Sequence, residues 1–249
     1  MSSGYKDRLY ATYLADHLAP RKGGASLEAL RARAQRWDKT LAAYLPADRD
    51  AAIADLGCGY GSVVWWLQQR GYANAGGIDV SHDQIEQGSG LGVRNLRQGD
   101  VLEFLRTASA QYDLLIARDL FEHLTKEDTL EALTLCREAL RPGGALLLQV
   151  PNGESPLAGR IIYGDFTHET AFTQASLSQV LRAAGFGSVA CFPVRPVVYG
   201  LKSWLRSLVW RVVETAIVTA IVAEVGPVRP IVTQNLLVVA GHGAPPRDA

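Results

Sequence analysis

One short stretch, residues 53–61 (I-A-D-L-G-C-G-Y-G), constrains the fold of this chain more than any other part. A short apolar run ends in Asp55 and Leu56, and three glycines then stand at alternate positions before a helical pattern begins. Glycine lacks a Cβ, so the chain can adopt positive φ angles there and a flat ligand can lie against the main chain. The stretch predicts a strand that turns sharply into a helix and binds a nucleotide-like cofactor at the turn. A tight strand-to-helix loop without a ligand is the simpler alternative.

Strand and helix patterns alternate from residue 51 onward, which predicts a parallel sheet with helices on both faces. Strands are expected at residues 51–56, 74–80, 93–97, 112–117, 145–150, 187–194 and 233–240. A Pro-Gly-Gly sequence (residues 142–144) predicts a turn before the fifth strand. The last strand has nothing of its own to pair with, so residues 49–249 are expected to form one domain. Two helical patterns within residues 1–48 precede the sheet, and we expect them to form an N-terminal helical lid or to pack on the domain.

Acidic residues stand at the ends of two further strands. In an open α/β sheet the ligand lies at the carboxyl ends of the strands, so these residues are candidates for cofactor contacts. Asp79 ends the second strand and is placed to accept both hydroxyl groups of a ribose. Asp100 follows the third strand and could bond an adenine amino group while Val101 covers the ring. Helix capping is the simpler role for either acid, but two acids at consecutive strand ends favour the cofactor.

A dinucleotide is the competing cofactor, and its fingerprint is G-x-G-x-x-G. After Gly57 and Gly59 the third glycine would stand at position 62, where this chain has Ser62. A pyrophosphate also favours free helix N–H groups, whereas an acid before the glycines suits a cationic ligand such as an amino-acid ammonium group. The dinucleotide is therefore the weaker fit.

The amino-acid composition limits the classes of binding partner and the cellular compartment that we expect for this chain. Lysine plus arginine and aspartate plus glutamate both number 25, so the basic excess that is typical of nucleic-acid-binding proteins is missing. We therefore expect no nucleic-acid partner. The three cysteines are far apart and form no C-x-x-C pair, which predicts neither a disulfide framework nor a zinc site. The first residues lack the pattern of a secretory signal, and we expect a cytoplasmic protein.

Five motifs together resemble those of class I S-adenosylmethionine-dependent methyltransferases, over roughly residues 50–185. They are D-L-G-C-G-Y-G (residues 55–61), G-I-D-V-S (77–81), G-D-V (99–101), D-L-F-E-H-L (119–124) and L-R-P-G-G-A-L-L-L (140–148). The resemblance implies a Rossmann-like α/β fold, with a seven-stranded, mostly parallel sheet between helices and an antiparallel last strand. It also implies S-adenosyl-L-methionine as cofactor. The residues expected to bind it are Asp55, Gly57, Cys58, Gly59, Gly61, Asp79, Val80, Asp100, Val101 and Arg118.

Two histidines are candidates for the base that accepts a proton from an acceptor hydroxyl, since histidine is the natural base near neutral pH. His123 follows the fourth strand, and His168 lies in the long loop after the fifth. The segment G-D-F-T-H-E-T-A-F-T (residues 164–173) resembles a branch of these enzymes that accompanies sugar or polysaccharide biosynthesis and methylates oxygen. We predict His168 or His123 as general base on a sugar-type hydroxyl, with Asp165 and Glu122 orienting it.

A metal ion is a second means of activating a hydroxyl group. Asp119, Glu122 and His123 would share one face if their segment is helical, and their oxygen and nitrogen atoms could hold Mg²⁺. A glutamate-histidine pair beside the cofactor without a metal is the alternative that we favour. The sequence leaves the presence of a divalent metal open.

An apolar helical insertion (residues 201–226) precedes the last strand. Serine, arginine and threonine recur every four residues in it and leave a wide apolar face that includes Trp204 and Trp210. Charged residues interrupt the segment, so it is not expected to span a bilayer. Three arrangements remain: packing on the domain's own surface, contact with a second copy or another partner, and peripheral contact with the inner face of a membrane.

We expect a methyltransferase that acts on a hydroxyl group of a sugar or glycan-type acceptor. One alternative is a methyltransferase for a small molecule or natural product, acting on oxygen or nitrogen. Another is a cofactor-binding subunit without catalysis of its own, docked on a partner through residues 201–225. The sequence does not identify the acceptor, because acceptor pockets are built from variable loops.

Overall fold

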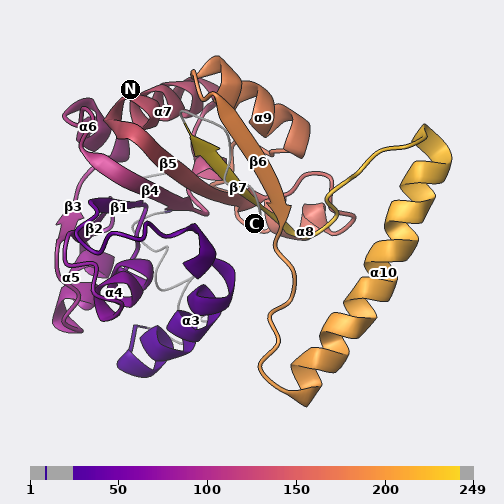
Figure 1. Ribbon diagram of the computed structural model, residues 1–249, viewed down its shortest axis with the longest axis horizontal. Helices are drawn as coiled ribbons and strands as arrows, with labels where there is room; N and C mark the ends of the chain where they lie inside the picture. The colour runs from indigo at the N-terminus through magenta and orange to yellow at the C-terminus, as the bar shows by residue number, and fades with distance from the viewer. Residues whose placement is uncertain (1–8, 10–24, 242–249) are drawn as a thin grey trace.

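The sheet brings the expected strand ends to one edge of the molecule. The computed structural model describes residue 9 and residues 25–241 (Figure 1). Its strand order is β3-β2-β1-β4-β5-β7-β6. The strands are β1 Ile53–Leu56, β2 Ala75–Asp79, β3 Leu96–Gln98, β4 Tyr112–Arg118, β5 Leu140–Pro151, β6 Ser188–Pro193 and β7 Asn235–Gly241. The first five run parallel, and β7 runs antiparallel to β5 and β6. This confirms the seven-stranded, mostly parallel Rossmann-like sheet.

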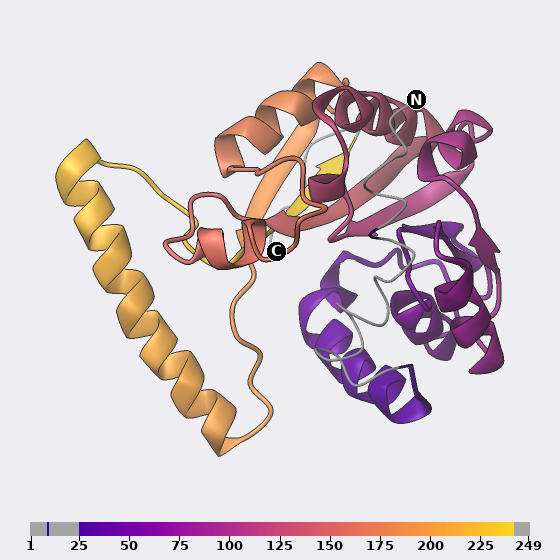
Figure 2. The same cartoon turned by 180° about the vertical axis from the view of Figure 1, so that it is seen from behind.

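Helices cover both faces of the sheet, as Figures 1 and 2 show from opposite sides. The helices of the described residues are α3 Leu27–Thr40, α4 Ser62–Gln69, α5 His82–Gly90, α6 Val101–Arg106, α7 Lys126–Ala139, α8 Ala158–Ile162, α9 Gln174–Ala183 and α10 Leu201–Val225, with 3-10 helices η2 Ala42–Tyr44 and η3 Phe121–His123. All but α10 belong to the body of the domain. Successive strand residues point to opposite faces. In β4, Leu115 and Ala117 pack with α6, α7 and α9, whereas Leu114 and Ile116 pack with α3 and α4. Burial on both faces explains the continuous apolar runs of these strands.

Side-chain caps fix where several helices begin. Ser26 Oγ accepts a hydrogen bond from the N–H of Ala29 at 3.1 Å and starts α3. Ser81 caps α5 in the same way, as the sequence predicts for both serines. Thr125 caps α7, and a capping box between Thr173 and Ser176 starts α9. Because caps satisfy N–H groups that have no partner within the helix, they set each helix start relative to the strand before it.

Two strands differ from the sequence expectation. β3 begins at Leu96, later than expected, and is short. β5 begins at Leu140 and includes residues 142–144, where the sequence predicts a turn. Leu140 pairs with Tyr112 before the register shifts, and Gly143 adopts a φ of 84°. The Pro-Gly-Gly sequence is therefore absorbed as an irregularity within the strand.

The expected N-terminal lid is described only in part. Residues 10–24, which hold most of the first helical pattern, lie outside the described residues, whereas α3 follows the second pattern. Leu30 and Trp37 of α3 are buried, and Trp37 belongs to the core beside β1. The division of the chain at residue 48 stays a prediction.

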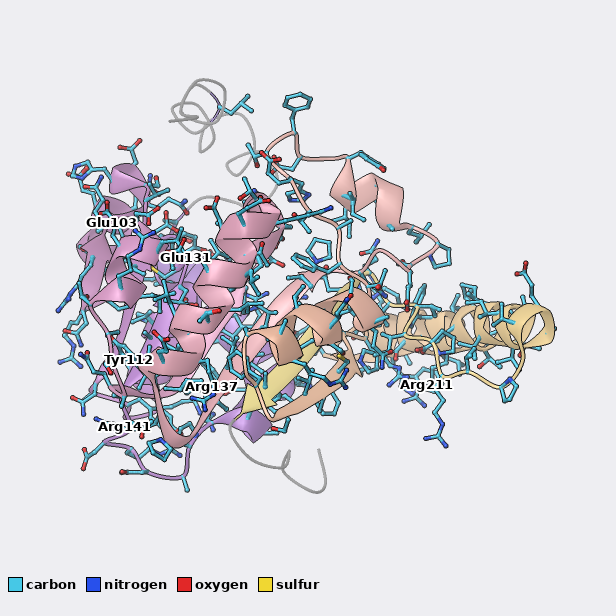
Figure 3. All side chains as sticks on the ribbon, turned by 90° about the horizontal axis from the view of Figure 1, so that it is seen from above. Glu103, Tyr112, Glu131, Arg137, Arg141 and Arg211 are labelled. Atoms are coloured by element: carbon cyan, nitrogen blue, oxygen red, sulfur yellow. The ribbon has the colours of Figure 1, made fainter. Side chains whose placement is uncertain are left out.

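The long helix α10 stands apart from the body of the domain (Figures 1 and 2). None of its 25 residues, all within the described part of the chain, is buried. Seen from above, the side chain of Arg211 extends away from the helix (Figure 3). Packing on the domain's own surface is therefore not the arrangement found. Among residues 25–241, no helix is long and apolar enough to cross a membrane.

Alanine substitutions at two glycines of α5 test how closely this helix packs beneath the glycine loop. A Cβ at Gly88 would lie against the carbonyl oxygen of Tyr60 and 2.6 Å from Leu96 Cδ1, whereas a Cβ at Gly90 would meet no atom within 4 Å. Alanine is favoured over glycine in a helix by roughly 0.5–1 kcal/mol. We expect Gly90→Ala to keep or raise the free energy of unfolding, and Gly88→Ala to lower it by about 1–3 kcal/mol in urea denaturation. Equal effects of the two changes would contradict this packing.

Candidate active site

The glycine loop adopts the turn that its sequence predicts. Gly57, Gly59 and Gly61 have φ angles of 68°, 56° and 78°, in the left-handed region that side chains disfavour. Space is also short, because a Cβ at Gly57 would lie 3.1 Å from Leu120 and one at Gly61 would lie 2.9 Å from Val93. The loop therefore presents bare backbone between β1 and α4.

Asp79, at the end of β2, ties the glycine loop to the neighbouring strand. Its Oδ2 accepts a hydrogen bond from the N–H of Gly59 at 2.8 Å, and its Oδ1 accepts one from the N–H of Ser81 at 2.9 Å. Burial raises the pKa of Asp79, and these two bonds oppose the rise. A carboxylate has about four lone-pair sites, so both oxygens keep capacity for ribose hydroxyls. The next residue, Val80, is 58% exposed and offers an apolar surface at the same edge.

Asp100 caps a helix, which is the simpler of its two predicted roles. Its Oδ1 accepts hydrogen bonds from the N–H groups of Leu102 at 2.8 Å and Glu103 at 3.0 Å, at the start of α6. Val101 packs partly against the core. The capping bonds use one carboxylate oxygen, so contact of Asp100 and Val101 with an adenine stays a prediction.

Asp55 and Arg118 lie at the ends of two paired strands, β1 and β4. Burial raises the pKa of Asp55 to about 7, although Arg118 opposes the rise. Burial also lowers the pKa of Arg118, whose guanidinium carbon lies 4.0 Å from the ring centre of Trp37 and whose Nη2 lies 3.6 Å from Asp119 Oδ2. A cation bound near Asp55 would favour its charged form. The strand ends therefore suit a ligand that carries an ammonium group.

Cys58 supports the loop through packing. Its side chain lies over Gly77 of β2, where a Cβ would come within 2.8 Å of the sulfur. Burial raises the pKa of the Cys58 thiol well above its usual value, with Asp55 and Asp79 adding to the rise, so the thiol stays protonated. The bare loop, the acids at the strand ends and the exposed Val80 together fit the ammonium, ribose and adenine groups of S-adenosylmethionine.

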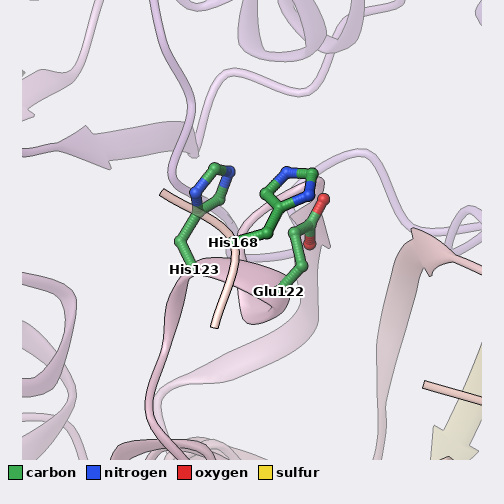
Figure 4. A group of neighbouring side chains, drawn as sticks. All are labelled: Glu122, His123 and His168. Carbon is green, nitrogen blue, oxygen red and sulfur yellow. The ribbon is translucent and has the colours of Figure 1, made fainter. Parts of the chain in front are cut away.

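His123 and His168 meet beyond the carboxyl ends of β4 and β5 (Figure 4). Their ring centres lie 4.7 Å apart in an edge-to-face arrangement. Thr167 Oγ1 donates a hydrogen bond to Asp165 Oδ1 at 2.7 Å, so it accepts one from Nδ1 of His123 at 2.8 Å. His168 Nδ1 lies 3.0 Å from the carbonyl oxygen of Ile162, which can only accept. Both neutral rings therefore carry their proton on Nδ1, and Nε2 is the nitrogen that can take up a proton.

Burial sets the charge of His123 and Glu122. It lowers the pKa of His123 to about 4, and repulsion from His168 contributes. It raises the pKa of Glu122 well above its usual value, with Asp119 adding to the rise. Glu122 is 2% exposed, and its Oε2 has no hydrogen-bond partner among the described residues. His123 is therefore expected to be uncharged at neutral pH, burial favours the uncharged form of Glu122, and an orienting role of Glu122 stays a prediction.

The group of residues that could hold a metal ion differs from the predicted one. In the described part of the chain it consists of Glu122, His123 and His168, whose ligand atoms lie within 4.8 Å of one another (Figure 4). Asp119 does not belong to it, because Asp119 has a φ of 56° and precedes η3 instead of continuing its helical face. Its Oδ1 accepts a hydrogen bond from the side-chain amide of Gln149 at 3.0 Å.

Three site residues were missed by reasoning from the sequence. Thr167 lies inside the segment of residues 164–173, and a hydroxyl between Asp165 and His168 was a usable signal. Trp37 and Gln149 carried no local signal, since the folded sheet alone brings them to Arg118 and Asp119.

A pocket adjoins Gln149 at the end of β5. Mostly apolar side chains line it, among them Leu41, Tyr44 and Phe192, and Lys39 adds a charged group. Residues 194–198, the start of the tether that leads to α10, complete the lining. The pocket is a candidate space for part of an acceptor.

Known proteins similar to this chain are methyltransferases. The profile of a family described as a methyltransferase domain matches residues 29–190. The chain is 33% identical to a trans-aconitate 2-methyltransferase of Deinococcus radiodurans over 193 residues, which cover 68% of this chain and 72% of that protein. It is 28% identical to a ubiquinone biosynthesis O-methyltransferase of Cereibacter sphaeroides over 204 residues, covering 75% and 79%. Its fold matches a SAM-dependent methyltransferase from Archaeoglobus fulgidus with a TM-score of 0.64 at 21% identity, covering 90% of this chain and 97% of that one.

Asp79→Asn tests the ribose contact. The amide removes the charged acceptor, and hydrogen bonds to charged groups contribute about 1.5–3 kcal/mol, so the Kd for S-adenosylmethionine should rise roughly 10- to 100-fold in isothermal titration calorimetry. Asp83→Asn changes an exposed acid in the first turn of α5 and should leave the Kd nearly unchanged. An unchanged Kd for Asp79→Asn would contradict the assignment.

The lowered pKa of His123 predicts that acid destabilises the protein. Unfolding raises this pKa from about 4 to 6.5, so between these pH values the unfolded state binds more protons. The free energy of unfolding should therefore fall by up to about 3 kcal/mol as the pH drops from 6.5 to 4. Urea denaturation at pH 7 and pH 4.5 should show that His123→Gln loses this dependence. His82→Gln, a change at an exposed histidine, should keep it.

Proposed function

Because this chain belongs to the S-adenosylmethionine-dependent methyltransferases, we propose that it methylates a hydroxyl oxygen of a sugar or glycan-type acceptor. The observation that carries the proposal is the pair His123 and His168 beyond β4 and β5, each with Nε2 as the nitrogen that can take up a proton. Transfer to oxygen requires such a base, because a neutral hydroxyl group is a weak nucleophile.

The roles of the acceptor-side residues follow from their hydrogen bonds. S-adenosylmethionine supplies a methyl group that its sulfonium charge already activates. The chain has to align the acceptor hydroxyl and take its proton, and we assign the proton to Nε2 of His168. His123, a weaker base because of its lowered pKa, packs edge-on against His168. In this proposal Asp165, acting through Thr167, and Glu122 orient the two rings.

In this proposal, residues at the ends of different strands bind different parts of the cofactor. Asp55 pairs with the ammonium group, and the carboxylate of Asp79 binds the ribose. Val80 covers one side of the adenine, and Asp100 with Val101 contacts its edge. Gly57, Cys58, Gly59 and Gly61 shape the backbone beside the methionine part, and Arg118 lies between cofactor and acceptor.

The choice of a sugar-type acceptor rests on residues 164–173, whose sequence resembles methyltransferases of sugar or polysaccharide biosynthesis. The names of the relatives favour a second candidate, an acceptor that is another small molecule: one relative is a trans-aconitate 2-methyltransferase and another a ubiquinone biosynthesis O-methyltransferase. The second name supports transfer to oxygen. We also propose that the reaction takes place in the cytoplasm, which the widely spaced cysteines support.

Labelled cofactor tests the acceptor directly. The protein is incubated with S-adenosylmethionine that carries a labelled methyl group and with panels of sugar nucleotides and glycans, of phenols and of organic acids. Label on a sugar hydroxyl is the expected result. Label only in the phenol or acid panel would replace the sugar by the second candidate. Cofactor binding with turnover only after a partner protein is added would favour a subunit without catalysis of its own.

His168→Asn tests the base. Asparagine can still donate a hydrogen bond to the carbonyl of Ile162 but cannot accept the proton, so kcat should fall roughly 10²- to 10⁴-fold while the Kd of the cofactor stays the same. Turnover at the wild-type rate would remove His168 from the mechanism.

Activity should also withstand EDTA. Activity lost to EDTA and restored by a divalent ion would instead make Glu122, His123 and His168 metal ligands.

A further inference from the structure

The face of α10 that points away from the domain is mostly apolar. Its exposed apolar side chains include Leu201, Leu205, Leu208, Val209, Val212, Ala216 and Ala223. The exposed Thr215 and Thr219 also lie on this face, and their hydroxyl groups donate hydrogen bonds to carbonyl oxygens of the helix itself. Leu201 is 79% exposed and Val212 is 66% exposed. Less exposed residues such as Ser203, Ser207 and Glu214 recur on the opposite side, toward the domain. A continuous apolar stripe on a surface helix marks a contact with another molecule or with lipid.

Positive charges border this stripe on both sides. At 3.6 residues per turn, Lys202 and Arg206 follow one flank of the stripe and Arg211 lies on the other, and all three are exposed. Glu214 lies on the domain side, where both its oxygens accept hydrogen bonds from Arg195 at 3.0 Å. The charge beside the stripe is therefore mainly basic, with Glu224 as an exposed acid near the end of the helix. The acid in the middle of the helix is turned away and paired.

Aromatic side chains lie at the basic end of the helix. Trp204 is 52% exposed, and Tyr199, just before α10, is equally exposed. Tryptophan and tyrosine combine an apolar ring with a polar group, which suits the boundary between lipid and water. Basic residues, aromatic residues and the apolar stripe thus occur together in one segment.

We propose that α10 docks on an anionic lipid bilayer, lying in the plane of its surface with the apolar stripe in the acyl region. Lys202, Arg206 and Arg211 would then reach the headgroups on both sides of the stripe, as long basic side chains do at interfaces. A span across the bilayer is not proposed, since no helix of the described residues is long and apolar enough.

A second copy of the chain fits α10 less well than lipid does. In an antiparallel helix pair centred on Val212, Lys202 would face a valine at position 222 of the other copy, Arg206 one at position 218 and Arg211 one at position 213. None of the three cations would have an acidic partner in this pair, and Glu214 is already held by Arg195. A surface of anionic headgroups pairs with all three.

Docking of α10 would also bring the domain to the membrane. The tether before α10 is held to α3, because Lys39 Nζ donates a hydrogen bond to the carbonyl oxygen of Val198 and lies 5.2 Å from the ring centre of Tyr199. The same tether lines the pocket beside Gln149. The proposal does not depend on the acceptor, since a protein inactive on sugars would still bind lipid.

Vesicle flotation with the full chain tests the proposal. We expect the protein to float with vesicles of phosphatidylcholine and phosphatidylglycerol. Its affinity should be lower on the order of 100-fold for phosphatidylcholine alone, because each basic residue near an anionic surface contributes roughly fivefold. Raised salt should weaken binding. The double change Leu205→Glu with Val212→Glu should abolish it, whereas Leu130→Glu, at an exposed leucine of α7, should not.

Variants that lack basic side chains distinguish binding to anionic lipid from the other possible contacts of α10. Changing Lys202, Arg206 and Arg211 together to glutamine should remove the preference for anionic vesicles, and the same change at exposed Arg31, Arg94 and Lys126 should not. Thermal unfolding checks that each variant is folded. Wild-type protein that never floats overturns the proposal. The proposal is also overturned if light scattering shows a dimer that the change L205E/V212E dissociates, and vesicles bind no protein. A second copy of the chain would then cover the stripe.

Discussion

The hydrogen bond from the N–H of Gly59 to Asp79 Oδ2 connects the parts on which the cofactor edge depends. It holds the middle of a loop whose three glycines have positive φ, a conformation that is costly for any other residue. The same carboxylate binds the N–H of Ser81, the cap of α5, and α5 packs through Gly88 against the carbonyl of Tyr60. The loop is thus held from the strand beside it and the helix beneath it, so its bare backbone is in place before a ligand arrives.

Burial governs the chemistry of the acceptor side. The rings of His123 and His168 touch, and two buried partners, Asp165 and Thr167, hold one of them. A protonated His123 would be costly there, which explains its low pKa and leaves its ring neutral over the usual pH range. Burial likewise raises the pKa of Glu122. Burial therefore disfavours charge on the two side chains beside His168.

The helix α10 differs from the other helices in leaving its apolar side chains exposed. Most helices of the domain bury apolar side chains, for instance Leu133 of α7 and Leu181 of α9. In α10, Leu201 and Val212 face solvent, although hydrophobic burial contributes about 25 cal/mol per Å² of apolar surface. The domain core is complete without this helix, so its apolar surface is available for a contact outside the domain. The tether that leads to this helix also lines the pocket beside Gln149.

Local features of the sequence determined the order of strands and helices, the caps at Ser26 and Ser81, the glycine turn and the position of Asp79. These features depend on periodicity, backbone freedom and hydrogen bonds within a few residues, and they could be predicted for that reason. The turn expected at residues 142–144 is found as an irregularity inside β5, because Leu140 pairs with Tyr112 and Ala145 with Leu114 while the residues between them have no partner on β4.

Contacts between distant segments were decided only by the tertiary structure. His168 replaces Asp119 beside Glu122 because the loops after β4 and β5 meet above adjacent strands. Trp37 reaches Arg118 because α3 packs beside α4 on the face of the sheet. The pKa values near the site depend on burial, which no short segment reveals. The same holds for α10, since an apolar helix has one sequence pattern whether it is packed or exposed, and only the fold shows that its outward face is left uncovered by the domain.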